Sequence, residues 1–132
     1  MKKVIILVVI VVAIFGGLIW LGKSNSSTST QAPTFASVQQ DVTSGAKLYD
    51  VRTADEYKAG HFASAVNWSL QDMQAGNMPN VAKDAKIFVY CHSGNRSGQA
   101  TALLKSAGYT NVTDLHGLTN DESIGGKIVT NG

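Results

Sequence analysis

The chain has a single cysteine, and the residues around it are of the types that make a thiol reactive. Cys91 follows a largely apolar run, 86–90, and opens the short loop 91–96 (CHSGNR). A stretch that predicts a helix, 97–107, comes directly after this loop. Backbone N–H groups of a tight loop and the positive end of a helix dipole both favour a thiolate over a thiol. We therefore interpret Cys91 as a nucleophile, and the alternative is an inert cysteine buried at the end of a strand.

The residues after Cys91 suit the binding of a small anion. Gly94 allows the loop to turn with its N–H groups pointing inward. Arg96 adds a permanent cation that can donate charge-assisted hydrogen bonds to the oxygens of a substrate. Ser97 is expected to cap the following helix rather than to react. The candidate substrate-binding residues are the neighbours of the nucleophile: Arg96, His92, Ser93, Gly94, Asn95 and Ser97.

The charge pattern favours an anionic substrate and argues against nucleic acid as a partner. The formal net charge is +2, but three lysines lie at or beside the apolar N-terminus, and without them the acids outnumber the bases by one. No basic run or interleaving of basic and aromatic residues is present, as a nucleic-acid surface would require. Between residues 85 and 113 there is no acidic residue, but there are three bases, Lys86, Arg96 and Lys105. This pattern predicts electropositive surroundings for Cys91.

Apolar spacing and turn residues predict alternating strands and helices. The predicted strands cover 47–51, 65–67, 86–90 and 111–115. The predicted helices cover 35–43, 55–59, 70–75 and 97–107, and Thr34 is placed to cap the first of them. The fold class is therefore α/β, an open and mainly parallel sheet flanked by helices. In such sheets the functional residues lie at the carboxyl ends of strands, where Cys91 is found.

The N-terminus predicts a membrane segment. Lys2 and Lys3 precede the uncharged run 4–22, which is long enough to cross a bilayer core of about 30 Å as a helix. We divide the chain into a transmembrane anchor or signal segment (1–23), a flexible Ser/Thr-rich linker (24–33) and a domain (34–132). The two lysines favour a cytoplasmic N-terminus, so the domain is expected on the extracytoplasmic side of the cell membrane. The alternative is cleavage of a signal peptide, which would leave a secreted or periplasmic protein.

Other polar and aromatic residues are expected to be structural. Asp50 and Arg52 end a predicted strand and are interpreted as an ion-pair network that can include Glu56. His61 is expected to be buried and hydrogen-bonded near the site, and Trp68 is expected in the core. The three histidines show no metal-ligand spacing with one another or with the cysteine, so neither a metal nor another cofactor is predicted.

Several short motifs, in this order and spacing, resemble the rhodanese-like sulfurtransferase domain over roughly residues 34–118. They are Tyr49-Asp50-Val51-Arg52, Asp55-Glu56-Tyr57, Gly60-His61, Ala65-Val66-Asn67, Val89-Tyr90-Cys91, Gly94-Asn95-Arg96-Ser97, and Leu103-Leu104 with Ala107-Gly108-Tyr109. The resemblance implies an open α/β fold with the reactive cysteine between a central strand and a helix. It also implies transfer of sulfane sulfur from thiosulfate or a related anion, through a persulfide on Cys91, to a thiol or cyanide.

The end of the chain departs from the usual pattern of this family. Where the family has Gly-Gly followed by a helix with a tryptophan, this chain has His116 at the first glycine and no tryptophan in 119–132. Together with the N-terminal export segment, this ending is similar to the exported single-domain members of the phage-shock protein E type. The departure affects the packing of the C-terminus rather than the loop around the cysteine.

Two other function classes remain open from the sequence. Cysteine-dependent phosphatases and arsenate reductases also place a thiolate and an arginine around an anion, with five residues between them. Here four residues, 92–95, separate Cys91 from Arg96, which makes a tighter ring of N–H groups. A non-catalytic or persulfide-carrying binding module of the same fold is the second alternative.

Overall fold

The computed structural model describes residues 33–130, which belong to one compact unit that begins at Ala32. The predicted anchor or signal segment, 1–23, and all of the predicted linker except residue 33 lie outside the described residues. Among residues 33–130, none of the helices has the length and apolar character needed to cross a membrane.

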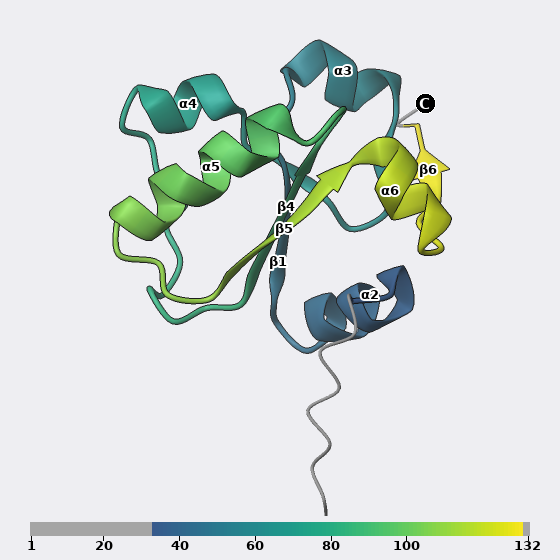
Figure 1. Cartoon of the computed structure of the whole chain (residues 1–132), viewed down its shortest axis with the longest axis horizontal. Helices are drawn as coiled ribbons and strands as arrows, with labels where there is room; N and C mark the ends of the chain where they lie inside the picture. Colours follow the sequence, from purple (N-terminus) through teal and green to yellow (C-terminus); the bar gives the residue numbers. More distant parts are fainter. Residues whose placement is uncertain (1–32, 131–132) are drawn as a thin grey trace, which may run out of the picture. The chain divides into compact units, whose positions relative to one another are not determined.

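A four-stranded parallel sheet forms the centre of the fold, with the strand order β3-β1-β4-β5. Figure 1 labels three of these strands, β1, β4 and β5. Its strands are β1 (Lys47–Asp50), β3 (Val66–Asn67), β4 (Ile87–Cys91) and β5 (Val112–Gly117). Every residue of β4 is buried, as expected of a central strand that is covered on both faces. Because parallel strands end at the same edge, the sheet brings the ends of β1, β4 and β5 together there.

Helices cover both faces of this sheet. They are α2 (Phe35–Thr43), α3 (Ala54–Ala59), α4 (Leu70–Gln74), α5 (Asn95–Ser106) and α6 (Leu118–Ser123). Figure 1 shows α4 and α5 on one side of the sheet and α2 and α6 on the other, with α3 near one end. The fold is thus α/β with a mainly parallel sheet and flanking helices, as the sequence predicts.

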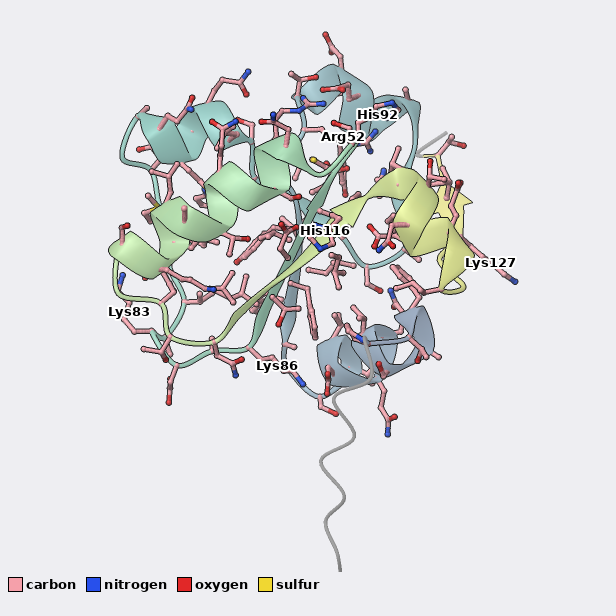
Figure 2. The ribbon with its side chains drawn as sticks, in the orientation of Figure 1. Arg52, Lys83, Lys86, His92, His116 and Lys127 are labelled. Carbon is pink, nitrogen blue, oxygen red and sulfur yellow. The ribbon has the colours of Figure 1, made fainter. Side chains whose placement is uncertain are left out.

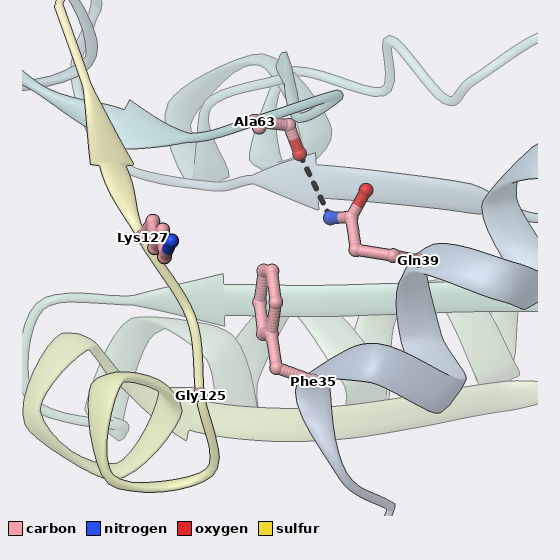
Figure 3. Close-up of a pocket in the computed structure, with 5 residues that line it drawn as sticks. All are labelled: Phe35, Gln39, Ala63, Gly125 and Lys127. Atoms are coloured by element: carbon pink, nitrogen blue, oxygen red, sulfur yellow. Dashed lines mark hydrogen bonds between the residues drawn. The ribbon is translucent and has the colours of Figure 1, made fainter.

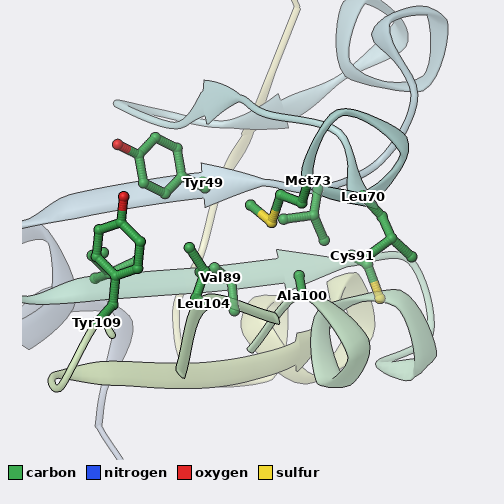
Figure 4. Packing of buried hydrophobic residues seen from close by; sticks show 10 residues of the cluster. Tyr49, Leu70, Met73, Val89, Cys91, Ala100, Leu104 and Tyr109 are labelled. Atoms are coloured by element: carbon green, nitrogen blue, oxygen red, sulfur yellow. The ribbon is translucent and has the colours of Figure 1, made fainter. Parts of the chain in front are cut away.

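Side chains alternate across the sheet and build one core on each face. Along β4, Ile87, Val89 and Cys91 belong to the core beneath α4 and α5, which Figure 4 shows. Phe88 and Tyr90 point the other way, into the core beneath α2. This period of two is the geometry of an extended strand. It places the cysteine sulfur on the same side of the sheet as α5.

A second, two-stranded sheet brings the C-terminal residues back to the body of the domain. In it, β2 (His61–Phe62) runs antiparallel to β6 (Ile128–Val129). The segment before β6 contributes to a small cavity of about 200 Å³ against α2. Figure 3 shows its lining, where the Gln39 side chain donates a hydrogen bond of 2.9 Å to the carbonyl of Ala63.

The local elements agree well with the sequence, and the differences lie at their ends. The helix Phe35–Thr43 is confirmed, with the Thr34 hydroxyl accepting from the N–H of Ser37 at 3.2 Å. α5 begins at Asn95, two residues before the predicted start, and β5 extends to Gly117. β2, β6 and α6 are not predicted from the sequence. β2 and β6 form by pairing with each other across the domain, which a local pattern does not reveal.

Candidate active site around Cys91

Cys91 is the last residue of β4, and its side chain is fully buried. In Figure 4 its sulfur lies at the end of the core under α4 and α5, next to Ala100 and Leu70. The strand therefore delivers the thiol to the carboxyl edge of the sheet, beside the beginning of α5. In open α/β sheets this edge is where ligands bind.

The loop after the strand directs a hydrogen-bond donor at the sulfur. The backbone N–H of Gly94 donates to Sγ of Cys91, with a distance of 2.9 Å between nitrogen and sulfur. Gly94 has a φ of 95°, in the left-handed region that favours glycine. It is also the N-cap of α5, so the donor is part of the positive end of that helix. Both the N–H and the helix end stabilise negative charge on the sulfur.

Ser97 does not cap the helix, contrary to the prediction. The N-cap is Gly94, so Ser97 lies in the first turn, with its side chain fully buried. Its hydroxyl is within hydrogen-bond reach of the carbonyls of Gly94, at 3.0 Å, and His116, at 3.3 Å. Its Oγ also lies 3.6 Å from Sγ of Cys91. Through these contacts Ser97 links the loop, α5 and the end of β5 next to the thiol.

The end of β5 supports the loop from the other side. The N–H of Leu118 donates to the carbonyl of His92 at 3.1 Å, and Ser93 forms an antiparallel bridge with Gly117. A Cβ atom at Gly117 would lie 2.5 Å from that carbonyl oxygen, so only glycine fits this approach. His116 has a φ of 69°, a conformation that glycine adopts most readily. Gly117 is a residue of the site that the sequence pattern does not predict.

Arg96 is held by a glutamate that comes from a distant part of the chain. Its Nη1 and Nη2 donate to the two carboxylate oxygens of Glu56, at 2.7 and 2.8 Å. The ion-pair partner of Glu56 is thus Arg96, whereas Arg52 pairs with Asp50, and Glu56 and Arg52 line the same depression. The Arg96 guanidinium holds the pKa of Glu56 far below its usual range. The pKa of Arg96 is raised, first by its hydrogen bonds with Glu56, and the charge of Cys91 adds to this shift.

The predicted electropositive surroundings of Cys91 are corrected by this geometry. Lys86 stands at the opposite end of β4, where its ammonium pairs with Asp41 at 2.6 Å. Figure 2 shows Lys83 and Lys86 at one end of the domain, and Arg52 and His92 at the other. Lysines that are near Cys91 in sequence are far from it in space, because a strand advances about 3.3 Å per residue. The cation next to the loop, Arg96, is balanced by an acid.

A buried ion pair fixes the end of β1 beside the site. Nε and Nη2 of Arg52 donate to the carboxylate of Asp50, and Nη2 also donates to the carbonyl of Gly60. The hydroxyl of Tyr90 donates to the same carboxylate at 2.9 Å and accepts from the N–H of Phe62 at 3.0 Å. Burial, followed by the charge of Asp50, raises the pKa of Tyr90 well above its usual range. The structural role predicted for Asp50 and Arg52 agrees with this arrangement.

A shallow depression of about 270 Å³ opens next to the loop. Among the predicted substrate-binding residues, His92 lines it with an exposed side chain. Its other lining residues come from the turn after β1, from α3 and its C-cap, from α6 and from β6: Arg52, Glu56, Ala59, Gly60, Leu118 and Ile128. Two C-terminal elements that the sequence did not predict, α6 and β6, therefore supply the apolar side chains Leu118 and Ile128 beside the loop.

The remaining predicted residues lie around this centre without meeting the sulfur. Ser93 and Asn95 are exposed on the loop, and the side chain of Asn95 accepts from Gln99 at 2.6 Å. His61 is buried, as predicted, with Nδ1 2.8 Å from the carbonyl of Tyr57.

Two further side chains of interest are those of His116 and Trp68. His116 is exposed and has Nδ1 3.4 Å from Asp114. Trp68 is half-buried at the edge of the core rather than within it, in an edge-to-face contact with Tyr49.

Comparisons with known proteins agree on the family to which this chain is related. The family model of the rhodanese-like domain matches residues 34–119. Thiosulfate sulfurtransferase PspE of Escherichia coli (strain K12) is 36% identical over 72 residues, which are 52% of this chain and 67% of that protein. The adenylyltransferase and sulfurtransferase UBA4 of Saccharomyces cerevisiae is 37% identical over 78 residues. The match spans 52% of this chain but only 18% of the yeast protein.

Solved structures give the same fold. A rhodanese with anions from Escherichia coli is 32% identical, with a TM-score of 0.54, and the match covers 64% of this chain and 98% of that one. The rhodanese-like domain of an Anabaena protein, solved by NMR, is 26% identical with a TM-score of 0.62, covering 76% of this chain and 81% of that one. Because the family model covers well over half of the sequence, including the whole loop around Cys91, this chain belongs to the rhodanese-like family of sulfurtransferase domains.

Proposed function

We propose that this domain transfers sulfane sulfur from thiosulfate or a related anionic donor to a thiol or cyanide, through a persulfide on Cys91. The observation that supports this most directly is the 2.9 Å contact from the Gly94 N–H to Sγ, at the N-terminus of α5. The same donor can stabilise the thiolate before the reaction and the outer sulfur of the persulfide after it. The thiosulfate sulfurtransferase activity in the name of the Escherichia coli relative agrees with the proposal.

The reaction has two displacements at sulfur. In the first, the Cys91 thiolate attacks the outer sulfur of thiosulfate, the S–S bond of thiosulfate breaks, and sulfite leaves with the bonding electron pair. In the second, a thiolate or cyanide attacks the outer sulfur of the persulfide. The products are a new persulfide or thiocyanate, and the Cys91 thiolate is released. No metal or organic cofactor takes part in this scheme.

The roles of the surrounding residues follow from their positions. Arg96 binds the donor's oxygens with those N–H groups that do not serve Glu56. Within the loop, the N–H of Gly94 contacts the sulfur, and His92 lines the depression from which a donor or acceptor approaches. Ser97 holds the loop through the carbonyl of Gly94. Because the Cys91 side chain is fully buried, a donor reaches the sulfur when the side chain turns or the loop moves outward.

Replacement of the nucleophile tests this proposal. Cys91→Ser should abolish thiocyanate formation from thiosulfate and cyanide. The wild-type domain, treated with thiosulfate, should gain the mass of one sulfur atom that a reducing agent removes. A matched control, the double variant Cys91→Ser/Ser93→Cys, keeps one thiol in the same loop and should remain inactive. An active Cys91→Ser protein would disprove the role of Cys91, and a wild type that is inactive with every sulfane donor would disprove the enzyme.

We further propose that the domain works on the extracytoplasmic side of the cell membrane, held by the segment 1–23. The motive is the uncharged run 4–22 behind Lys2 and Lys3. Fractionation of cells and sequencing of the mature N-terminus test it, and the expected product is a membrane-bound chain that retains residue 4. A product in the soluble fraction that begins between residues 24 and 33 would show a cleaved signal instead.

A further inference from the structure

Two ion pairs lie next to the depression beside the Cys91 loop. Arg52 is paired with Asp50, and Arg96 is paired with Glu56 through two short hydrogen bonds. Of the residues that line the depression, Glu56 is the acidic one. A substrate at the loop therefore meets an arginine whose charge is already compensated.

Glu56 is fixed in this position from behind. The N–H and the hydroxyl of Thr53 both donate to its Oε2, at 3.0 and 2.9 Å, and Thr53 in turn accepts from the N–H of Glu56 at 3.3 Å. This reciprocal arrangement is a capping box, which anchors the side chain to the start of α3. Thr53 also helps to keep the carboxylate ionised, since its hydrogen bonds lower the pKa of Glu56 further. Glu56 cannot swing away when an anion approaches without losing these contacts.

This arrangement has unequal consequences for donors of different charge. A donor with one negative charge can use the free N–H groups of Arg96 and the loop N–H groups. The other cation that lines the depression, Arg52, is already paired with Asp50, so a second negative charge gains no uncompensated cation there and is repelled by Glu56. At a separation of about 6 Å and an effective dielectric constant of about 40, between the limits for protein and for bulk water, one such repulsion changes an equilibrium by roughly tenfold.

We propose that Glu56 determines specificity by favouring singly charged sulfane donors, such as thiosulfonates and small persulfides, over doubly charged thiosulfate. Glu56 acts through Arg96 and does not touch the reacting atoms. The inference rests on the proposed sulfur transfer and names the class of donor that the site prefers.

Thiosulfate and methanethiosulfonate form a matched pair of probes. Both have a terminal sulfane sulfur on a tetrahedral sulfur, but methyl replaces one oxygen in the thiosulfonate, which removes one negative charge. With either probe the Cys91 thiolate forms a bond to the sulfane sulfur and the donor's S–S bond breaks. The leaving group that takes the electron pair is sulfite from thiosulfate and methanesulfinate from methanethiosulfonate. A change in their relative rates therefore reports on charge.

The experiment compares kcat/KM for the two donors in the wild type and in Glu56→Gln. Glutamine retains a capping-box oxygen for Thr53 but lacks the charge. The ratio of kcat/KM for thiosulfate to that for methanethiosulfonate should rise by about tenfold in Glu56→Gln. Asp55→Asn is the control, because it removes the same charge from an exposed neighbour in the same helical turn. Its ratio should stay within about twofold of the wild type.

A second measurement separates this inference from the proposed function. Sulfate and methanesulfonate, which cannot donate sulfur, should protect Cys91 from alkylation by iodoacetamide if they bind the loop. In the wild type methanesulfonate should protect better than sulfate at equal concentration, and Glu56→Gln should reduce or reverse this preference. This readout holds even if sulfur transfer itself is never observed.

The outcomes are distinct. A shifted donor ratio, or a shifted protection preference where no donor is turned over, supports the role of Glu56. A wild type that turns over neither donor disproves sulfur transfer alone. If Glu56→Gln slows both donors equally in step with a lower thermal midpoint, Glu56 is merely structural and the inference fails. Glu56→Asp, which keeps the charge, should restore the wild-type ratio, and unchanged ratios in all variants would overturn the proposal.

Discussion

Among single residues, Arg96 has surroundings that the sequence did not predict. A free arginine beside the loop would serve the substrate alone, but here Nη1 and Nη2 bind Glu56 first. Arg96 therefore neutralises Glu56 at the depression beside the loop, in addition to its proposed role of binding an anionic substrate. Removing it costs a hydrogen-bond donor and also exposes the thiolate to the charge of Glu56.

Arg96→Ala should reduce kcat/KM for thiosulfate by about 10- to 150-fold, which is the loss expected for a charge-assisted hydrogen bond. Arg96→Lys should recover only part of this, because lysine keeps the charge but not the planar pair of donors. Steady-state kinetics with thiosulfate and cyanide measure both effects. Arg96→Ala combined with Glu56→Gln should be less impaired than Arg96→Ala alone, since the uncompensated carboxylate is gone.

Stability measurements provide the control for Arg96. The side chains of Arg96 and Glu56 are 29% and 36% exposed, and ion pairs of this kind contribute about 1 kcal/mol or less. The thermal midpoint should therefore move little in Arg96→Ala. Wild-type kinetics in this variant, or an activity loss that only follows unfolding, would contradict the assigned role.

Among the elements, the loop is shaped by three neighbours: β4, α5 and the junction of β5 with α6. The strand supplies the thiol, and α5 supplies the donor at its N-terminus. The junction at Gly117 and Leu118 sets how closely the loop can approach β5, since the carbonyl of His92 accepts from it at 3.1 Å. The position of the loop is thus determined by backbone contacts as well as by its own sequence.

Gly117→Ala should damage both stability and activity. The added Cβ would lie 2.5 Å from the carbonyl oxygen of His92 and 3.0 Å from Cα of Ser93, so the backbone must shift. We expect a loss of about 1–3 kcal/mol in the free energy of unfolding and slower loading of sulfur onto Cys91. Urea unfolding and mass spectrometry after thiosulfate treatment measure the two effects.

Gly98→Ala is the matched control on the exposed side of α5. There the nearest atom to a Cβ is Oδ2 of Asp114, at an ordinary 3.7 Å. Alanine in a helix should stabilise the protein by about 0.5–1 kcal/mol relative to glycine. Equal effects of the two substitutions would show that the close approach at Gly117 has no energetic importance.

For the whole molecule, the C-terminal residues complete the domain. They form α6 and β6, and Ile128 reaches the depression beside the site. Asp121 of α6 is fully buried in this region. Burial, followed by the charge of Asp114, raises the pKa of Asp121 to about 7, against an opposing hydrogen bond with Asn120. The C-terminal segment therefore contains a carboxyl group that titrates near neutral pH.

The free energy of unfolding should fall as pH rises through the range between the unfolded and folded pKa values of Asp121, 3.8 and about 7. In that range the folded protein keeps a proton that the unfolded chain releases, so raising the pH favours unfolding. At about 1.4 kcal/mol per pKa unit the total effect is a few kcal/mol. Urea unfolding of the wild type from about pH 5 to about pH 8 measures it.

Asp121→Asn should remove this dependence and be the more stable protein above neutral pH, because the amide cannot ionise. Glu122→Gln removes the same charge from an exposed neighbour and should leave the slope unchanged. If the wild type and Asp121→Asn lose stability in parallel as the pH rises, Asp121 is not the group responsible.

The sequence by itself determined the features that depend on neighbouring residues. The α/β class, the helix Phe35–Thr43 and the placement of Cys91 at the end of a buried strand all follow from local spacing and turn residues. The motifs in 34–118 also sufficed to indicate the family, because their order along the chain is a property of the sequence alone.

The tertiary structure alone decided which charges and backbones meet at the thiol. Glu56 reaches Arg96 across 40 residues of sequence, and Gly117 supports the loop only because β5 lies beside β4. Conversely, Lys86 is near Cys91 in the chain but at the far end of the strand. Such contacts depend on how strands are ordered in the sheet and how helices cross it. Local periodicity carries no information about that order, so the charge balance at the site became visible only in the folded domain.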